Sequence, residues 1–466
     1  MNIANIFIFT ADILDKILFF EIFHIPLLIL FFISAGLYFT IRLGFPNVKL
    51  FKHGLEVALK NKYYSPKDKG EITPRQALLT SMSSMVGLGN IAGVAVAVSI
   101  GGPGAIIWMM IMAFFGMSTV FAETILGHKY RYIDEKGIVN GGPFRYLKTG
   151  LNELGYKKLG ISLSIAFALL STLSGIGGSA IFQTHEAISS LTEFDFLKNQ
   201  SLMLSIIFTS FTGFVIIGGI KRLSKVMDKV VPAMTIIYIG SCLVILAFNF
   251  QNLLPAFQIM FEDAFAFNSV KAGFLGTFIT GIRRSSFSNE AGLGSAPITY
   301  STMKTNEPVR QASVACLNPF VDTMIVCLMT GLVIIVSGVY NLPNAGDGVV
   351  LTRNAFATVG EWFPIMLTTA IVLFATSTLM GSGYASQSSW IYLFGKKSVH
   401  IFNIIYCLAV FYAYQIDFSS MIKIADTFVL AIAIPNIMGL FLLRNVVKKE
   451  YITYLKKLKS GYFDEK

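Results

Sequence analysis

The chain has 466 residues, of which 54% are hydrophobic and only 14% are charged. Soluble domains carry about 25% charged residues, so this composition argues against an ordinary soluble enzyme or binding module. The formal net charge of +11 would indicate a nucleic-acid partner in a soluble protein. Here the basic residues lie in loops between long apolar runs, so no nucleic-acid partner is expected. The cysteines stand singly in apolar stretches, without the spacing of a metal or disulfide framework.

Long apolar runs recur along the whole chain, and a helix that crosses a lipid bilayer needs about 20 such residues. We expect about eleven spans, numbered here in chain order, at residues 24–41, 77–100, 104–127, 161–190, 201–219, 230–249, 271–300, 312–338, 363–394, 400–416 and 421–443. Spans 4, 7 and 9 are long enough to imply a tilt or a break. A transmembrane barrel would instead show short segments of alternating hydropathy. The sequence therefore predicts an all-α polytopic membrane protein.

Basic residues alternate from loop to loop. They are abundant after spans 1, 3, 5 and 11, occur in pairs after spans 7 and 9, and are scarce in the loops between, such as TEFDFLKNQ after span 4. Because Lys and Arg are enriched in cytoplasmic loops, we place the N-terminus outside and the C-terminus in the cytoplasm, with the protein in the cell inner (plasma) membrane. The first residues lack the basic region of a cleavable signal peptide, so none is expected.

Spans 2 and 7 are interrupted by glycine and polar residues. Span 2 reads TSMSSMVGLGNIAGVAVAV, with a break expected near 85–90, and span 7 reads FLGTFITGIRRSSFSNEAGLGSAPI, with a break near 287–295. A glycine inside a helix costs about 1 kcal/mol, and unsatisfied backbone groups in lipid cost several more. Such breaks persist only where they line a cavity or are buried in protein. The alternative is that the glycines merely let helices pack closely.

The two broken spans run in opposite directions and lie five spans apart. This arrangement indicates an inverted repeat of spans 2–6 and 7–11, with span 1 as an additional helix. The corresponding regions are 1–76 (accessory helix and basic cytoplasmic loop), 77–250 (first half), 251–444 (second half) and 445–466 (basic cytoplasmic tail). Helix N-termini at the breaks suit a carboxylate, and opened carbonyls suit a small cation. A zwitterion carried with sodium would use both.

Several motifs follow one another along the chain. They are GLGNIAGVA at 87–95, GGPGAIIWMMIMAFFGM at 101–117, FAE at 121–123, GGPFRYL at 141–147, GGIKRLSKVMDKVVP at 218–232, FSNEAGLGSAPI at 287–298 and EPVRQ at 307–311. With this ordered set, over nearly its whole length, the sequence resembles the sodium:alanine symporter (amino-acid carrier) family. The resemblance implies a leucine-transporter fold, with a 5+5 inverted repeat and here an additional N-terminal helix. It also implies sodium-driven uptake of alanine, glycine or related small amino acids.

Three places depart from the family pattern. GMSTV has Val120 where a lysine is usual, FQTH has His185 where asparagine is common, and STLMGSGYASQ lacks the bulky stretch and the acid usual in span 9. The small residues at 381–383 favour a side-chain pocket, between spans 4 and 9, that is roomier than in the family. A polar substrate side chain would then have Gln183 or His185 as its partner.

The resemblance also implies where sodium binds. In the leucine-transporter fold, a hydroxyl pair on the helix equivalent to span 9 and carbonyls at the first break hold a sodium ion; here these are Ser377 and Thr378 with carbonyls near Ser83 and Val86. Oxygen ligands suit sodium as a hard cation, by the same logic as for calcium or magnesium. The alternative is that the hydroxyls bond to their own helix. No cofactor other than this coupling ion is expected.

The expected substrate site lies between the two breaks. Its candidate residues are Gly87, Gly89, Asn90, Gln183, Ser288, Asn289, Gly292 and Gly294. We expect the break in span 2 to hold the substrate carboxylate and the break in span 7 to face the amine. Gln183 could instead join helices, and Asn289 with Glu290 could instead satisfy the opened backbone.

Ionisable groups at membrane depth or near it are functional candidates by default. They are Glu123, His185, Glu186, Asp322 and Asp426. Arg283 and Arg284 are expected to neutralise the nearby Glu290, and His185 leaves proton coupling open because histidine titrates near neutral pH.

The leading hypothesis is sodium-coupled symport of a small neutral amino acid, alanine or glycine first, by alternating access in a protein that functions as a monomer. The alternatives are symport of a larger polar amino acid such as glutamine or asparagine, proton coupling and, more remotely, a channel or a substrate sensor. No filter-like repeat favours a channel, and no paired nucleophile and base or metal cluster favours an enzyme. No P-loop favours transport driven by ATP.

Overall fold

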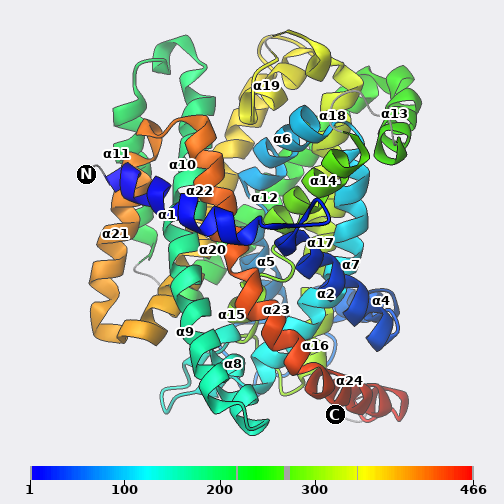
Figure 1. The fold of residues 1–466 in the computed structure, drawn as a ribbon, viewed down its shortest axis with the longest axis vertical. Coiled ribbons are helices and arrows are strands. Elements are labelled where there is room, and N and C mark those ends of the chain that lie inside the picture. Colours follow the sequence, from blue (N-terminus) through cyan, green and yellow to red (C-terminus); the bar gives the residue numbers. More distant parts are fainter. Residues whose placement is uncertain (1–2, 217–218, 267–272, 344, 464–466) are drawn as a thin grey trace.

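A computed structural model describes residues 3–216, 219–266, 273–343 and 345–463, and it is mostly helical. Parts of three expected segments lie outside these ranges, namely residues 217–218 of span 5, 271–272 of span 7 and 464–466 of the tail. Most long helices run along one direction of the molecule, as Figure 1 shows. Two short antiparallel hairpins accompany them, β1 (Glu21–Ile22) with β2 (Ile25–Pro26) and β3 (Tyr132–Ile133) with β4 (Val139–Asn140). The predicted all-α fold class is confirmed.

The N-terminal region contains a helix that the hydropathy pattern did not predict. This helix, α1 (Ile3–Leu18), lies across the direction of the long helices and precedes α2 (Leu27–Leu43), which corresponds to span 1 (Figure 1). Lys423 donates a hydrogen bond of 2.5 Å to Asp12 of α1. The short helices α3 (Pro46–Lys49) and α4 (Phe51–Lys60) follow α2.

Span 2 is broken, as its glycines predict. Its two parts are α5 (Pro74–Met85) and α6 (Ala92–Gly101), separated by the single turn η1 (Leu88–Asn90) and bent by 62°. The start of α5 is well defined, because Thr73 and Gln76 form a reciprocal capping box and Pro74 occupies the first helical position.

The rest of the first half contains one unbroken helix for span 3 and a distorted helix for span 4. The elements are α7 (Ala105–Lys129), α8 (Pro143–Glu153), α9 (Lys157–Leu173), the π-helical η2 (Ser174–Ala180), α10 (Ile181–Thr192), η3 (Asp195–Leu197), α11 (Ser201–Ile216), α12 (Gly219–Phe248) and η4 (Phe250–Asn252). Span 4 is therefore distorted by a π-helical segment, a feature often found at functional sites.

The second half repeats the pattern of a broken first span. Its elements are α13 (Leu253–Phe265), α14 (Gly273–Asn289), α15 (Ala296–Tyr300), α16 (Pro308–Ala315), α17 (Leu317–Pro319), the π-helical η5 (Phe320–Cys327), α18 (Leu328–Ser337), η6 (Val339–Asn341), α19 (Val349–Ala357), α20 (Pro364–Phe394), η7 (Lys396–Ser398), α21 (Val399–Tyr412), η8 (Ala413–Gln415), α22 (Phe418–Ala431), α23 (Ala433–Leu442) and α24 (Arg444–Lys459). The break in span 7 separates α14 from α15. Span 9, in contrast, is the single helix α20.

The number of membrane spans remains a prediction. Within the described ranges, seven helices are long and apolar enough to cross a membrane, or eight if the bent pair of span 2 counts as one span. The helix α2 and residues 201–214 of α11 are shorter apolar helices. These helices support a multi-pass membrane protein, whereas the expected total of about eleven is not confirmed.

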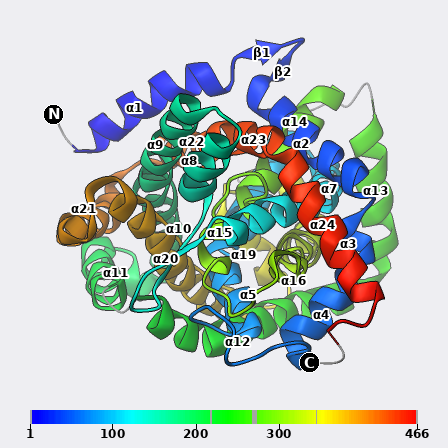
Figure 2. The same ribbon diagram turned by 90° about the horizontal axis from the view of Figure 1, so that it is seen from below.

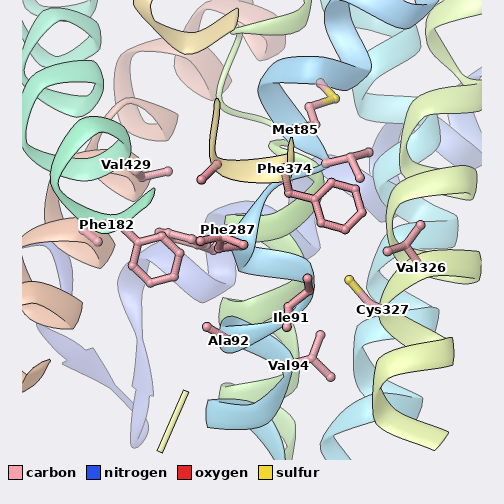
Figure 3. Packing of buried hydrophobic residues seen from close by; sticks show 14 of the residues in the cluster. Met85, Ile91, Ala92, Val94, Phe182, Phe287, Val326, Cys327, Phe374 and Val429 are labelled. Atoms are coloured by element: carbon pink, nitrogen blue, oxygen red, sulfur yellow. The ribbon is translucent and has the colours of Figure 1, made fainter. Parts of the chain in front are cut away.

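Aromatic side chains pack around the break in span 2. The rings of Phe182 and Phe287 meet edge to face with centroids 5.4 Å apart, and Figure 3 shows both rings close to the first break. A Cβ atom built on Gly89 would lie 3.2 Å from Cδ1 of Phe287. The glycine therefore allows the broken backbone to approach this aromatic pair.

The C-terminal helix α24 crosses the predicted cytoplasmic end of the bundle, as the view from below in Figure 2 shows. It is tied to helices from both halves. Lys129 of α7 donates to Glu450 at 2.5 Å, and Lys457 donates to Glu307, just before α16, at 2.7 Å. His53 of α4 hydrogen-bonds the hydroxyl of Tyr454 at 2.7 Å.

One arginine joins three segments at the same end of the molecule. The guanidinium of Arg131, just beyond α7, donates to the carbonyl oxygens of Lys69, Ser301, Met303 and Thr305 at 2.7 to 3.0 Å. The loop between α4 and α5, which contains Lys69, and the segment after α15 therefore share one donor group with the end of α7.

Candidate functional site

The break in span 2 is held by side-chain acceptors. The backbone amide of Gly87 donates to Oδ1 of Asn90 at 3.0 Å, and the amide of Leu88 donates to Oε1 of Gln183 at 3.0 Å. Gln183 comes from α10, so it joins span 4 to the break. The structure therefore places Gly87, Asn90 and Gln183 together, with two of the opened amides already paired in this conformation.

The break in span 7 is a turn at 290–295 between α14 and α15. Glu290, Gly292 and Gly294 all have positive φ angles, 54°, 91° and 76°, and a non-glycine residue in this region is uncommon. Asn289, the last residue of α14, accepts from the amide of Ala291 at 3.0 Å. Asn289 therefore satisfies the opened backbone, which was one of its two expected roles.

Asp322 connects the two breaks. It lies in the π-helical η5 and is fully buried, and its carboxylate accepts from Asn90 Nδ2 and from the Ser288 hydroxyl at 2.7 Å each. The hydroxyl of Thr323 donates to it at 2.8 Å. These three donors are all neutral, although a buried carboxylate is costly without a cation. Asp322 therefore concentrates negative charge where the two broken spans meet.

The predicted sodium ligands divide into two groups. The hydroxyl of Thr378 lies 3.4 Å from the carbonyl oxygen of Val86, so the structure brings span 9 to the first break. In contrast, the Ser377 hydroxyl donates to Phe374 O at 2.9 Å within its own helix. The alternative of bonding within the helix thus describes the Ser377 hydroxyl, and the expected carbonyl ligand near Ser83 stays a prediction.

A small cavity lies beside both breaks. Its volume is about 30 Å³, enough for about one water molecule. The lining comes from spans 2, 4, 7, 9 and 11 and consists of Ser84, Ser171, Ser174, Gly175, Ser179, Glu290, Leu293, Ser295, Ser382, Ala385, Ser386, Val429 and Ile432. The lining includes seven serine hydroxyls and one carboxyl group, although most of the surface that it presents to the cavity is apolar.

Of the small residues at 381–383, only Ser382 lines the cavity. The expectation that this pocket is roomier than in the family stays a prediction. A Cβ atom on Gly381 would meet Ser83 Oγ and Ser84 N at 2.8 Å, and one on Gly383 would meet Ile216 at 3.1 Å. Both glycines therefore serve close helix packing.

His185 is not among the cavity-lining residues. Its Nδ1 lies 3.1 Å from Oε1 of Glu186. The other carboxylate oxygen of Glu186 accepts from the amide of Val349 at the start of α19. Glu186 therefore fixes the loop helix α19, and His185 is not placed to contact a substrate in the cavity.

The expected pairing of Arg283 and Arg284 with Glu290 is wrong. Both arginines pair with Asp426 of α22 instead, Arg283 at 3.0 Å. Glu290 accepts from Ser295 within its own turn. Asp426 is almost fully buried and can hold two guanidinium groups, whereas the turn directs Glu290 toward the cavity.

Sequence reasoning missed Asn436, Tyr146 and Thr323 as parts of this region. Asn436 of α23 donates to Glu123 Oε1 at 2.6 Å and to the carbonyl of Gly292 at 2.8 Å, and its own Oδ1 accepts from Tyr146. The available signal was a lone amide in the apolar run AIPNIMGL. Glu123 and Gly292 meet through this amide.

Residues 10–466 match the sodium:alanine symporter family. The chain belongs to this family. It is 38% identical over 431 residues to the sodium/alanine symporter AgcS of Methanococcus maripaludis, covering 91% of this chain and 93% of that protein. It is also 33% identical over 439 residues to the probable sodium/glutamine symporter GlnT of Bacillus subtilis, covering 93% of this chain and 89% of that protein.

A solved structure shares the fold of this family member. The crystal structure of MhsT in complex with L-phenylalanine matches with a TM-score of 0.50 and 15% identity, over 82% of this chain and 99% of MhsT. At this identity the match concerns the fold alone. It agrees with the expected leucine-transporter-like arrangement of broken helices.

Proposed function

We propose that this protein is a sodium-coupled symporter that carries a small neutral amino acid into the cell by alternating access, with its N-terminus outside and its C-terminus in the cytoplasm. The observation that carries the proposal is the buried carboxylate of Asp322 between two helix breaks. Its donors Asn90 and Ser288 come from the two different breaks. A cation at this point would offset the buried charge and join the two halves.

Sodium has two sets of oxygen atoms to bind. One is the carbonyl of Val86 with the hydroxyl of Thr378, and the other is the carboxylate of Asp322 with nearby oxygens such as that of Ser288. Hard cations prefer such oxygen ligands. The second set carries a formal negative charge, so we expect it to contribute more to the free energy of sodium binding.

The substrate class follows from the groups around the cavity. The amides of the first break suit a carboxylate, but those of Gly87 and Leu88 are paired with Asn90 and Gln183 in this conformation. Substrate binding therefore exchanges at least one of these bonds for a bond to the substrate carboxylate. The amine would face the second break, where Glu290 lines the cavity.

The side chains that line the cavity favour a small substrate. They are mainly serines, which suit a hydrogen, methyl or hydroxymethyl side chain. We therefore place alanine, glycine and serine ahead of glutamine. One additional methylene changes discrimination by only about 1–3 kcal/mol, so overlap between small substrates is expected.

Uptake into proteoliposomes tests the proposal. Radiolabelled alanine should accumulate under an inward sodium gradient, and glycine and serine should compete better than glutamine. Alaninamide lacks the carboxylate and should compete poorly. Accumulation driven by a pH gradient without sodium would replace the proposal by proton coupling, and equal competition by alaninamide would refute anchoring of the carboxylate.

A further inference from the structure

A buried polar cluster closes the cavity on its predicted cytoplasmic side. Asn436 stands at its centre, and its bonds to Glu123, Gly292 and Tyr146 join α23 to α7, to the break in span 7 and to α8. The side chains of Asn436, Glu123 and Tyr146 are fully buried. One amide thus connects four segments of the chain. We call this cluster the inner latch.

The latch lies directly behind the cavity wall. Ile432, which lines the cavity, precedes Asn436 by about one helical turn. Leu293, also in the lining, lies between Gly292 and Gly294. A Cβ atom on Gly294 would meet Asn436 at 3.0 Å and Pro143 of α8 at 2.5 Å. There is therefore no room between the wall and the latch for an amino acid to pass.

Span 11 is interrupted just beside this cluster. The helix α22 ends at Ala431, and α23 begins at Ala433 and contains Pro435. A proline removes one backbone hydrogen bond of the helix, which makes bending there less costly. Movement of α23 at this point would carry Asn436 away from Gly292.

We infer that Asn436 is a positioning residue of transport, which keeps the inner wall of the cavity closed until its bonds to Gly292 and Tyr146 break. The inference rests on the proposed function only for the identity of what passes through the cavity. Opening toward the cytoplasm then separates α23 and α8 from the break in span 7.

The test measures access to the cavity rather than transport. Ser174, which lines the cavity, is replaced by Cys as a reporter, and its modification by a membrane-impermeant maleimide is timed from the cytoplasmic side without sodium or amino acid. Asn436→Ala should accelerate modification by about five-fold or more, because each lost hydrogen bond shifts such an equilibrium by roughly that factor. Tyr146→Phe removes one bond and should give a smaller increase.

The chain offers a matched control. Asn318 is also fully buried, accepts from a tyrosine hydroxyl (Tyr300) at 3.0 Å and donates to Ser81 at 2.7 Å, but none of its bonds is to a residue of the latch. Asn318→Ala should leave the modification rate unchanged. An equal increase in this control would overturn the inference, because it would indicate general loosening of the bundle.

Folding is checked by monodispersity and thermal unfolding of each variant. If Asn436→Ala does not fold, Tyr146→Phe decides alone, and a rate equal to that of the parent would refute the latch. Because no solute is transported in this assay, the latch can be supported even if the uptake experiments reject sodium-coupled amino-acid transport. Conversely, unchanged access in Asn436→Ala refutes the latch even if symport is confirmed.

Discussion

Gly381 gives the sharpest test of the contact between spans 2 and 9. An added Cβ atom would lie 2.8 Å from both Ser83 Oγ and the backbone nitrogen of Ser84, and restoring an ordinary contact of 3.4 Å requires a shift of about 0.6 Å. The serine hydroxyl can rotate away, but the backbone nitrogen cannot. Gly381→Ala should therefore push the two helices apart, at a cost of about 1–3 kcal/mol typical of overpacking.

This shift occurs close to the proposed sodium ligands. Gly381 follows Thr378 by about one helical turn, and the hydroxyl of Thr378 lies 3.4 Å from the carbonyl of Val86. Metal–ligand distances tolerate changes of only about 0.2 Å. We expect the sodium concentration for half-maximal uptake to rise roughly ten-fold, which corresponds to about 1.4 kcal/mol.

The assay is alanine uptake in proteoliposomes as a function of external sodium, with thermal unfolding measured in parallel. Gly93→Ala is the matched control, because an added Cβ atom there has no neighbour within 4 Å. Its sodium dependence should equal that of the parent protein. A normal sodium dependence in Gly381→Ala, with the protein folded, would refute the assigned contact.

Four further predictions follow from named contacts. Thr378→Val should weaken sodium-dependent uptake far more than Ser377→Ala, because the Ser377 hydroxyl bonds within its own helix. Equal effects of the two changes would indicate that both hydroxyls bind sodium. Asp322→Asn should raise the half-saturating sodium concentration by at least about ten-fold, since it removes the charge that offsets the cation, and an unchanged sodium titration would exclude this ligand set. Arg284→Gln should lower the stability by roughly 3 kcal/mol in thermal unfolding, because it leaves the buried Asp426 with one guanidinium, and Asp426→Asn should restore part of the loss. Burial and the nearby Arg310 and Lys62 lower the pKa of His53 from 6.5 to about 4, so between these pH values His53 takes up a proton only when this region is unfolded. The docking of α24 should therefore weaken as the pH falls from 6.5 toward 4, which faster proteolysis of the tail would report. His53→Gln should remove this pH dependence.

The two helix breaks could be predicted from the sequence, because glycine and polar residues at membrane depth have few other structural explanations. The partners of individual side chains could not. Ser377 and Thr378 are neighbours in sequence, but adjacent residues on a helix point about 100° apart, so only one faces the break. Arg283 and Arg284 were assigned to the nearby Glu290, whereas their partner Asp426 lies 142 residues from Arg284 in the sequence.

Short helices outside the expected spans were the other gap. The helices α1, α13 and α19 have 16, 13 and 9 residues, below the length of about 20 apolar residues that identifies a span. Asn436 illustrates a related difficulty. A single amide in an apolar run indicates a hydrogen-bonded partner, but nothing in the run identifies Gly292, Glu123 and Tyr146 as the groups it bonds.

Arg131 has a mechanical consequence for the transport cycle. A planar guanidinium that donates to four peptide carbonyls cannot rotate without lengthening several hydrogen bonds at once, so the connection that it forms is rigid. The end of α7, the loop between α4 and α5 and the segment after α15 should therefore move as one rigid unit. Under the proposed function, the movements that follow binding of ion and solute at the two breaks would then occur where α23 and α8 meet this unit.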